Sequence, residues 1–145
     1  MSKIDKDSSD DLKDEFTGDS YRIVHCKNAI KSFDKALDSV NAQKKKKFKR
    51  AMIQQIQRLA DKGKLSQENF PSEAALPNIK GQSGTKTFNA FKRKPVRGYC
   101  WLSQKHRNTY FISHYINKDF DKLDPTDTEK VHNNWRRIEV NGDEC

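Results

Sequence analysis

The stretch RGYCWLSQKHRNTYFISHYIN, residues 97–117, carries the strongest structural signal in this chain. Two runs in it, RGYCWLSQ (97–104) and TYFISHYIN (109–117), are rich in the aromatic and β-branched residues that favour strands. The polar segment Lys105–Asn108 separates them and has the length of a hairpin loop. We therefore expect an antiparallel β-hairpin.

The expected register of this hairpin brings three chemically useful side chains to one face of the sheet. Side chains alternate between faces along a strand, so directly paired residues share a face. Arg97, Tyr99 and His114 then lie together at one end of the hairpin. A change of one residue in the loop would instead set Arg97 beside Tyr115. The expected pairs are Gln104–Thr109, Trp101–Ile112, Tyr99–His114 and Arg97–Ile116.

Working outward towards the N-terminus, the segment YRIVHC (21–26) predicts a first strand, and two apolar stripes follow it. Each stripe has the spacing of a helix, but the two stripes do not lie on one continuous face. This predicts two helices joined near Asn41–Gln43, the first capped by Asn28 and the second ending at Gly63. The stripes are Ile30, Phe33, Leu37 and Val40, then Phe48, Met52, Ile56 and Leu59.

Residues 64–84 contain two prolines and two glycines and predict a long, partly ordered connection to a strand at TKTFNAF (85–91). The sequence DPTD (124–127) is a strong helix start. The order β-α-α-β-β-β-α predicts an α+β fold: a small antiparallel hairpin sheet with an N-terminal strand, a helical hairpin on one face, and a C-terminal helix. We expect the other face of the sheet to remain open for a site.

Charge is distributed unevenly along the chain. The net charge is −4 over residues 1–20, +17 over residues 21–118, and −4 over the last 27 residues. We expect an acidic disordered tail at 1–20, a single domain at 21–140 and a disordered end at 141–145. A segment as basic as the middle one favours contact with nucleic acid, most simply RNA, although a solubilising surface is the alternative.

Composition also narrows the location and the class of the protein. No apolar run reaches the length that crosses a bilayer, and the acidic N-terminus is unlike a signal or transit peptide. Three cysteines without regular spacing argue against a disulfide scaffold. We therefore expect a cytoplasmic protein with no membrane partner, no cofactor and no metal.

The hairpin residues have the chemistry needed for RNA cleavage without a metal. Such cleavage needs a base, an acid, and a cation for the charge that develops on the phosphate. Histidine, here His114, can serve as the base or the acid in such chemistry, and Arg97 can hold two phosphate oxygens. Tyr99 or Tyr115 could stack an unpaired base. A purely structural His114 remains the alternative.

A lysine run, Lys44–Lys47, opens the second predicted helix and is a candidate RNA-binding patch. Its four members are Lys44, Lys45, Lys46 and Lys47. Such runs are also commonly just solvated, and the sequence does not choose between these interpretations.

Four segments resemble the RelE/HigB superfamily, which are toxins of bacterial type II toxin–antitoxin pairs. The segments are LPNIKG (76–81), FNAFKRKP (88–95), RGY (97–99) and FISHYINK (111–118). The resemblance implies a RelE-like fold and a ribosome-associated, metal-independent mRNA endonuclease held inactive by a cognate antitoxin. The superfamily also includes toxins directed at gyrase, and fold alone does not choose between functions.

The same resemblance assigns roles to individual positions. The basic residues of the family's middle strands match Lys92, Arg93, Lys94 and Arg97, and its late-strand positions match His114, Tyr115 and Lys118. It implies a catalytic set of Arg97, His114, Tyr115 and Lys92. One position departs from the family pattern, because Cys100 stands where a basic residue is usual. A non-catalytic RNA-binding or regulatory module on the same fold is the alternative function.

Overall fold

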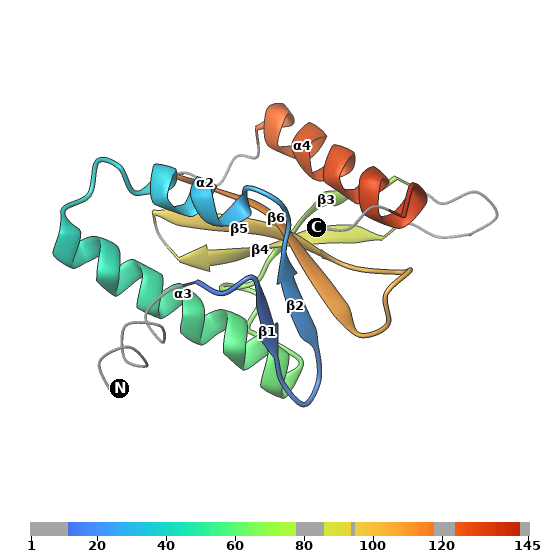
Figure 1. The fold of residues 1–145 in the computed structure, drawn as a ribbon, viewed down its shortest axis with the longest axis horizontal. Coiled ribbons are helices and arrows are strands. Elements are labelled where there is room, and N and C mark those ends of the chain that lie inside the picture. The colour runs from blue at the N-terminus through green and yellow to red at the C-terminus, as the bar shows by residue number, and fades with distance from the viewer. Residues whose placement is uncertain (1–11, 78–85, 94, 118–123, 143–145) are drawn as a thin grey trace.

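The chain forms an α+β fold built on one six-stranded mixed sheet with three α-helices (Figure 1). This computed structural model describes residues 12–77, 86–93, 95–117 and 124–142. The α+β prediction is confirmed. The elements are β1 (Glu15–Thr17), β2 (Arg22–His25), α2 (Ala29–Ala36), α3 (Ala42–Lys62), β3 (Ser72–Ala75), β4 (Thr87–Arg93), β5 (Val96–Leu102), β6 (Thr109–Asn117), α4 (Pro125–Trp135) and a π-helical turn at Arg136–Val140.

The sheet is mixed rather than purely antiparallel. Its strand order is β1-β2-β6-β5-β4-β3. Strand β2 runs parallel to β6, and all other neighbours are antiparallel. Parallel neighbours need a long crossover, which α2, α3 and the strands up to β5 supply here. The expected N-terminal strand is present, and it pairs with the last strand instead of standing at an edge.

Helices α2 and α3 cover one face of the sheet, and their boundary follows local chemistry. Asn41 caps α3 by accepting a 2.9 Å hydrogen bond from the Lys44 backbone, and Gly63 ends it with a positive φ of 82°. The second helix begins at Ala42, within the predicted junction at Asn41–Gln43, but α2 ends at Ala36, so Leu37 and Val40 of the first stripe lie in the connection. Asn28 precedes α2 in a left-handed conformation, and its side chain makes no capping bond.

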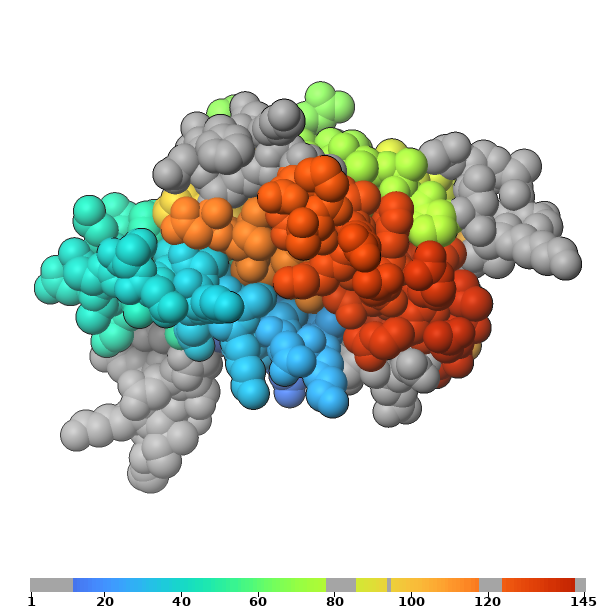
Figure 2. All heavy atoms as spheres, turned by 90° about the horizontal axis from the view of Figure 1, so that it is seen from above, coloured from blue at the N-terminus to red at the C-terminus, as the bar shows by residue number. Residues whose placement is uncertain are grey.

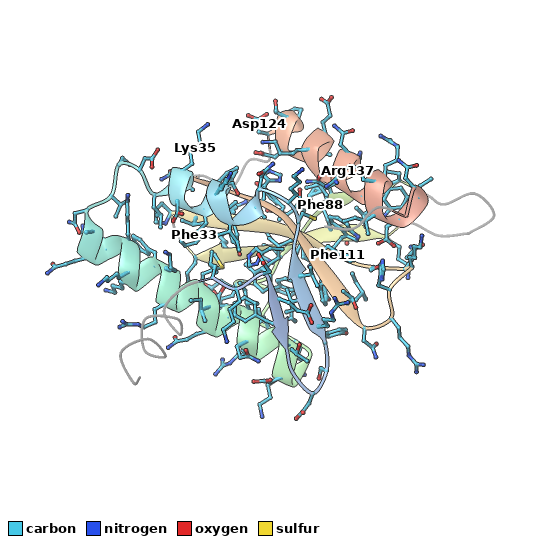
Figure 3. The ribbon with its side chains drawn as sticks, viewed as in Figure 1. Phe33, Lys35, Phe88, Phe111, Asp124 and Arg137 are labelled. Atoms are coloured by element: carbon cyan, nitrogen blue, oxygen red, sulfur yellow. The ribbon has the colours of Figure 1, made fainter. Side chains whose placement is uncertain are left out.

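Helix α4 covers the opposite face, so the expectation of an open sheet face is wrong. Figure 3 shows Phe33 on the α2 side of the sheet and Phe88 on the α4 side, and these residues belong to separate cores. Trp135 of α4 packs with Trp101 of β5, and both are buried. Viewed from above, β6 lies between light-blue α2 and red α4 (Figure 2). The apolar stripe of α4 needs a partner surface, and the free sheet face supplies it.

The predicted disorder of residues 1–20 is wrong for the part that the structure describes. Glu15–Thr17 form β1, which pairs with β2, and Leu12 and Phe16 are buried in the core beneath α3. The segment after β1 contacts the end of α3, where the backbone N–H groups of Ser20 and Tyr21 both donate to the Ala60 carbonyl. Residues 1–11 lie outside the described residues.

The connection after α3 contains a strand that the sequence did not predict. Ser72–Ala75 form β3, the edge strand beside β4. It is short, half-exposed and irregular in its register, so it has no apolar alternation that could reveal it. The C-terminal limit expected at residue 140 lies next to the end of the π-helical turn, and residues 143–145 lie outside the described residues.

The hairpin register is confirmed at one end and shifted at the other. Tyr99 pairs with His114 and Arg97 with Ile116, as expected. Near the loop, however, Trp101 pairs with Phe111 rather than with Ile112. A β-bulge between these regions leaves Ser113 as the extra residue of β6 and absorbs the difference.

Gly98 is required where β5 passes the ring of Tyr115. A Cβ atom at position 98 would lie 2.5 Å from Cε1 of Tyr115, and that ring is buried and held by His25. We expect Gly98→Ala to lower the free energy of unfolding by about 1–3 kcal/mol, as measured by urea unfolding. In a Tyr115→Ala background the same substitution should cost less, because the obstructing ring is absent. An equal cost in both backgrounds would contradict this explanation.

Candidate functional site

A cluster of polar side chains lies buried between β5, β6 and α4, and it contains three residues that the sequence placed together. Arg97, Tyr99 and His114 share the α4 face of the sheet, with the Tyr99 and His114 rings 5.3 Å apart between centroids. All three are buried, with exposed fractions of 3%, 0% and 4% respectively. The predicted convergence is therefore present, but beneath a helix.

Arg97 pairs with a carboxylate from the edge strand. Its Nη1 atom donates to Glu73 Oε1 at 2.9 Å, and both side chains are largely shielded from water. A buried ion pair of this kind is stable only while both partners stay in place. In this conformation the Arg97 guanidinium is engaged within the protein and covered from a phosphate in solution.

His114 joins β6 to α4 through a chain of hydrogen bonds. Its Nε2 atom lies 3.0 Å from Asp127 Oδ1, and its Nδ1 atom lies 2.8 Å from Ser113 Oγ. Asn134 of α4 in turn donates to Ser113 Oγ at 2.8 Å. These contacts are consistent with Nε2–H donating to the Asp127 carboxylate while Nδ1 accepts from Ser113. The bulge at Ser113 therefore serves to dock α4.

Tyr99 is the member of the cluster whose hydroxyl lacks a well-formed hydrogen bond among the described residues, although Arg97 lies near it. Burial raises the pKa of Tyr99 well above its usual value, nearby Asp127 and Glu73 add to the rise, and Arg97 opposes it. The phenol is therefore protonated at neutral pH. A buried hydroxyl without a well-formed hydrogen bond lowers stability, so the Tyr99 hydroxyl is the group of this cluster whose hydrogen bonding is least complete.

Tyr115 lies on the opposite face of the sheet and does not join this cluster. Its hydroxyl is 2.6 Å from His25 Nε2, its ring packs against Phe33, and it is 2% exposed. Burial raises the pKa of Tyr115 well above its usual value. The same face holds Cys100, whose thiol pKa burial also raises. Neither side chain is placed to stack a base or to contact a phosphate.

A separate group of basic residues lines a groove between α3 and the end of β4. Three adjoining hollows of about 510, 470 and 460 Å³ share Ala51 and Arg93 in their walls. Basic side chains dominate these walls, and Asp61 and Glu68 are the acidic ones. The basic lining residues are Lys46, Lys47, Arg50, Arg58, Lys62, Lys92 and Arg93.

The groove takes in three of the eight predicted RNA-binding residues together with the predicted catalytic Lys92, and it is separate from the buried cluster. Lys92, Arg93, Lys46 and Lys47 line it, and Lys44 and Lys45 lie at the start of the same helix. Lys94 and Lys118 lie outside the described residues. The predicted set therefore divides into a buried polar cluster and an exposed basic groove.

Several functional partners were missed at the sequence level. Glu73, Asp127 and Asn134 hold the buried cluster, yet each lies far along the chain from the strand that it contacts. Arg58 and Lys62 extend the groove, and their spacing from Arg50 along a helix was a usable signal.

A second hollow, of about 920 Å³, lies at the other edge of the sheet and combines both signs of charge. Asp14, Glu15, Lys27 and Lys31 are among its lining residues. In the described part of the chain, no group of three His, Cys, Asp or Glu side chains could hold a metal ion. No described helix is long and apolar enough to cross a membrane.

Comparisons with models of protein families, with curated proteins and with solved structures found no match to this chain. The interpretation of the site therefore depends on its own geometry and charge.

The buried His25 predicts a pH dependence of stability. Burial lowers its pKa to about 4, against the opposing effects of the Lys13 carbonyl and the Asp14 charge. Since an unfolded histidine titrates near 6.5, the unfolded state takes up a proton first as pH falls. We expect about 3 kcal/mol of stability to be lost between about pH 6.5 and 4.

Urea unfolding across this pH range tests the assignment against His25→Gln. Glutamine can still donate to the Lys13 carbonyl and accept from Tyr115, but it does not titrate. The variant should therefore show a shallower decline in stability with falling pH. Parallel declines in the two proteins would assign the pH dependence to another group.

Proposed function

We propose that this protein binds RNA through the basic groove between α3 and β4. The observation that supports this function is the groove itself, a continuous hollow with seven basic side chains and two acidic ones in its walls. Counterion release from a polyanion is the main source of affinity for a surface of this charge. The amide side chains of Gln43, Gln54 and Asn69 also line the groove and can bond to sugars or bases.

The charges on α3 also oppose the stability of the helix that carries them. Lys44 and Lys45 lie beside the positive end of the helix dipole, and no acidic residue occupies the first turn. Lys46 and Arg50 are like charges four residues apart, which is unfavourable in an isolated helix. A protein that only needed solubility could place these charges at less cost, so their position supports a binding role.

A membrane surface is a poorer partner for this groove than RNA. Interfacial binding needs apolar side chains that enter the lipid. The exposed large hydrophobic residues among the described ones are Leu102 and Val140, and neither lines the groove.

The affinity for RNA should fall steeply with salt concentration. Replacing Lys44–Lys47 together with glutamine should reduce the slope of log K against log salt by at most about 3, at about 0.7 for each phosphate that is no longer neutralised. The melting temperature should stay the same or rise, because the substitutions relieve repulsion at the helix start. Fluorescence anisotropy with a labelled RNA at several salt concentrations measures the slope. A wild-type slope near zero would exclude this function.

A second candidate is the ribosome-associated mRNA endonuclease toxin that the RelE/HigB resemblance implies, with a cognate antitoxin as partner. The observation that favours it is the juxtaposition of Arg97, Tyr99 and His114, which are a cation, a phenol and an acid/base in one cluster. In this conformation the cluster is covered by α4, so cleavage would require α4 to leave the sheet. Catalysis would then depend on breaking the His114–Asp127 contact.

The second candidate is tested by substituting its acid/base and its cation. His114→Gln should lower the rate of mRNA cleavage on ribosomes by roughly 10²–10⁴-fold, and Arg97→Lys by roughly 10²–10³-fold. Both proteins must first be shown to fold by thermal melting, because Arg97 and His114 each have a buried partner. Mapping of mRNA ends after induction in bacteria gives the rates, and EDTA should have no effect on the purified reaction. If the wild-type protein cleaved no mRNA, the endonuclease function would be excluded and RNA binding would remain as the proposed function.

A further inference from the structure

A single row of exposed side chains follows the whole outer face of α3. Every fourth residue is exposed in this row, and four of the five carry positive charge. Successive members rise by about 6 Å along the helix axis, so the row extends over about 24 Å. The row consists of Lys46, Arg50, Gln54, Arg58 and Lys62.

The wall opposite this row lies at the end of β4. Arg93 lines all three hollows of the groove, and Asn69 and Lys92 stand beside it. The groove therefore has the cations of α3 on one side and Lys92 and Arg93 on the other, with Asp61 and Glu68 as the acidic residues of its walls. A strand lying in it would meet charge on both of its edges, which favours a narrow polyanion over a broad one.

The floor of the groove is chemically different from its rims. Phe48 and Leu65 are half-buried and contribute apolar surface. Gln55 lines the hollow nearest to Arg58 and is 8% exposed. Its Oε1 atom is itself buried and accepts no hydrogen bond within the described chain, so a rotation of the Gln55 side chain would have to turn this oxygen towards a bound base. A phosphate has no donor for this oxygen, whereas a base amino group or a ribose hydroxyl has one.

A duplex fits this arrangement poorly. The inner face of α3 is buried on the sheet through Met52, Ile56 and Leu59, so only its outer face can meet a nucleic acid. The major groove of duplex RNA is in any case too deep and narrow for side chains to read. Paired bases also turn their edges towards each other and away from Phe48 and Gln55.

We infer that the groove binds single-stranded RNA, with its phosphates along the row from Lys46 to Lys62 and its bases turned towards Phe48 and Gln55. This inference rests on the proposed RNA-binding function and assigns the form of RNA that the groove accepts. Single-strand binding without strong sequence preference combines a basic groove with aromatic side chains on which bases stack, and Phe48 is the aromatic residue that lines these hollows.

The first test compares a fluorescein-labelled single-stranded RNA of about twelve nucleotides, within the usual range of single-strand site sizes, with the same strand annealed to its complement. Fluorescence anisotropy with the full chain should give at least tenfold tighter binding of the single strand. Equal or tighter binding of the duplex would overturn the inference while leaving RNA binding intact. Salt-independent or absent binding of both forms would instead remove the proposed function itself.

The second test locates the strand with matched charge removals. The double variant Arg58→Gln/Lys62→Gln should reduce the salt slope for the single strand by about 1.4, since two phosphates are no longer neutralised. The control, Lys27→Gln/Lys31→Gln, removes the same charge from exposed residues that line the hollow at the other edge of the sheet, and its slope should change little. Equal effects of the two variants would show diffuse attraction rather than a defined path.

The third test concerns the floor of the groove. Gln55→Leu removes an unsatisfied buried oxygen, so the melting temperature should not fall. If bases reach this position, the variant should bind the single strand at least threefold more weakly at the same net charge. Unchanged affinity would overturn the placement of the bases at Gln55.

Discussion

The bulged pairing of β5 with β6 determines which side chains lie on each face of the sheet. Ser113 is the extra residue of β6, so Tyr99 meets His114 although Cys100 meets Ile112. Without the bulge, the alternation would place His114 on the α2 face and Tyr115 on the α4 face. Ser113 also bonds to His114 and accepts from Asn134, so the residue that shifts the register helps to dock α4. Both cores of the protein depend on this one irregularity.

Arg97 and His114, which the sequence predicted to be catalytic, are buried under α4 in this conformation and contact carboxylates of the protein itself. Arg97 is paired with Glu73, which joins β5 to the edge strand β3, and His114 contacts Asp127, which joins β6 to the helix that follows it. Removing Glu73 would leave the buried Arg97 charge without its carboxylate partner, at a cost on the order of 3–5 kcal/mol. The network therefore favours a closed arrangement of β3, β6 and α4. It leaves the exposed groove on α3 as the surface that a large anionic partner can reach.

The sequence predicted those features that depend on neighbouring residues. The break before Asn41, the end at Gly63 and the helix start at Asp124 all follow from capping chemistry within a few residues. The Tyr99–His114 pair was also predicted, although the loop register that led to it was wrong and the bulge restored it. Strands β1 and β3 were missed because they are too short to show periodicity, and their pairing depends on distant strands. Glu73 was missed because it lies on β3. Asp127 lies in the predicted helix, but its contact with His114 depends on α4 covering the sheet face that was expected to be open, and the burial of the predicted catalytic residues was missed with it.

Helices α3 and α4 differ in how the charges of their first turns interact with the helix dipole. Helix α4 begins with Asp124, whose side chain accepts from the Thr126 backbone, and carries Asp127 in its first turn. Helix α3 begins with a capping Asn41 and then carries Lys44–Lys47, with no acid in its first turn. Since acids at a helix start are stabilising and cations are not, α4 follows the rule that α3 breaks. The lysines at the start of α3 therefore do not stabilise the helix. Their position is better explained by an interaction with another molecule. Sequences that violate a local rule commonly do so where the residue serves binding, which is the role proposed for α3.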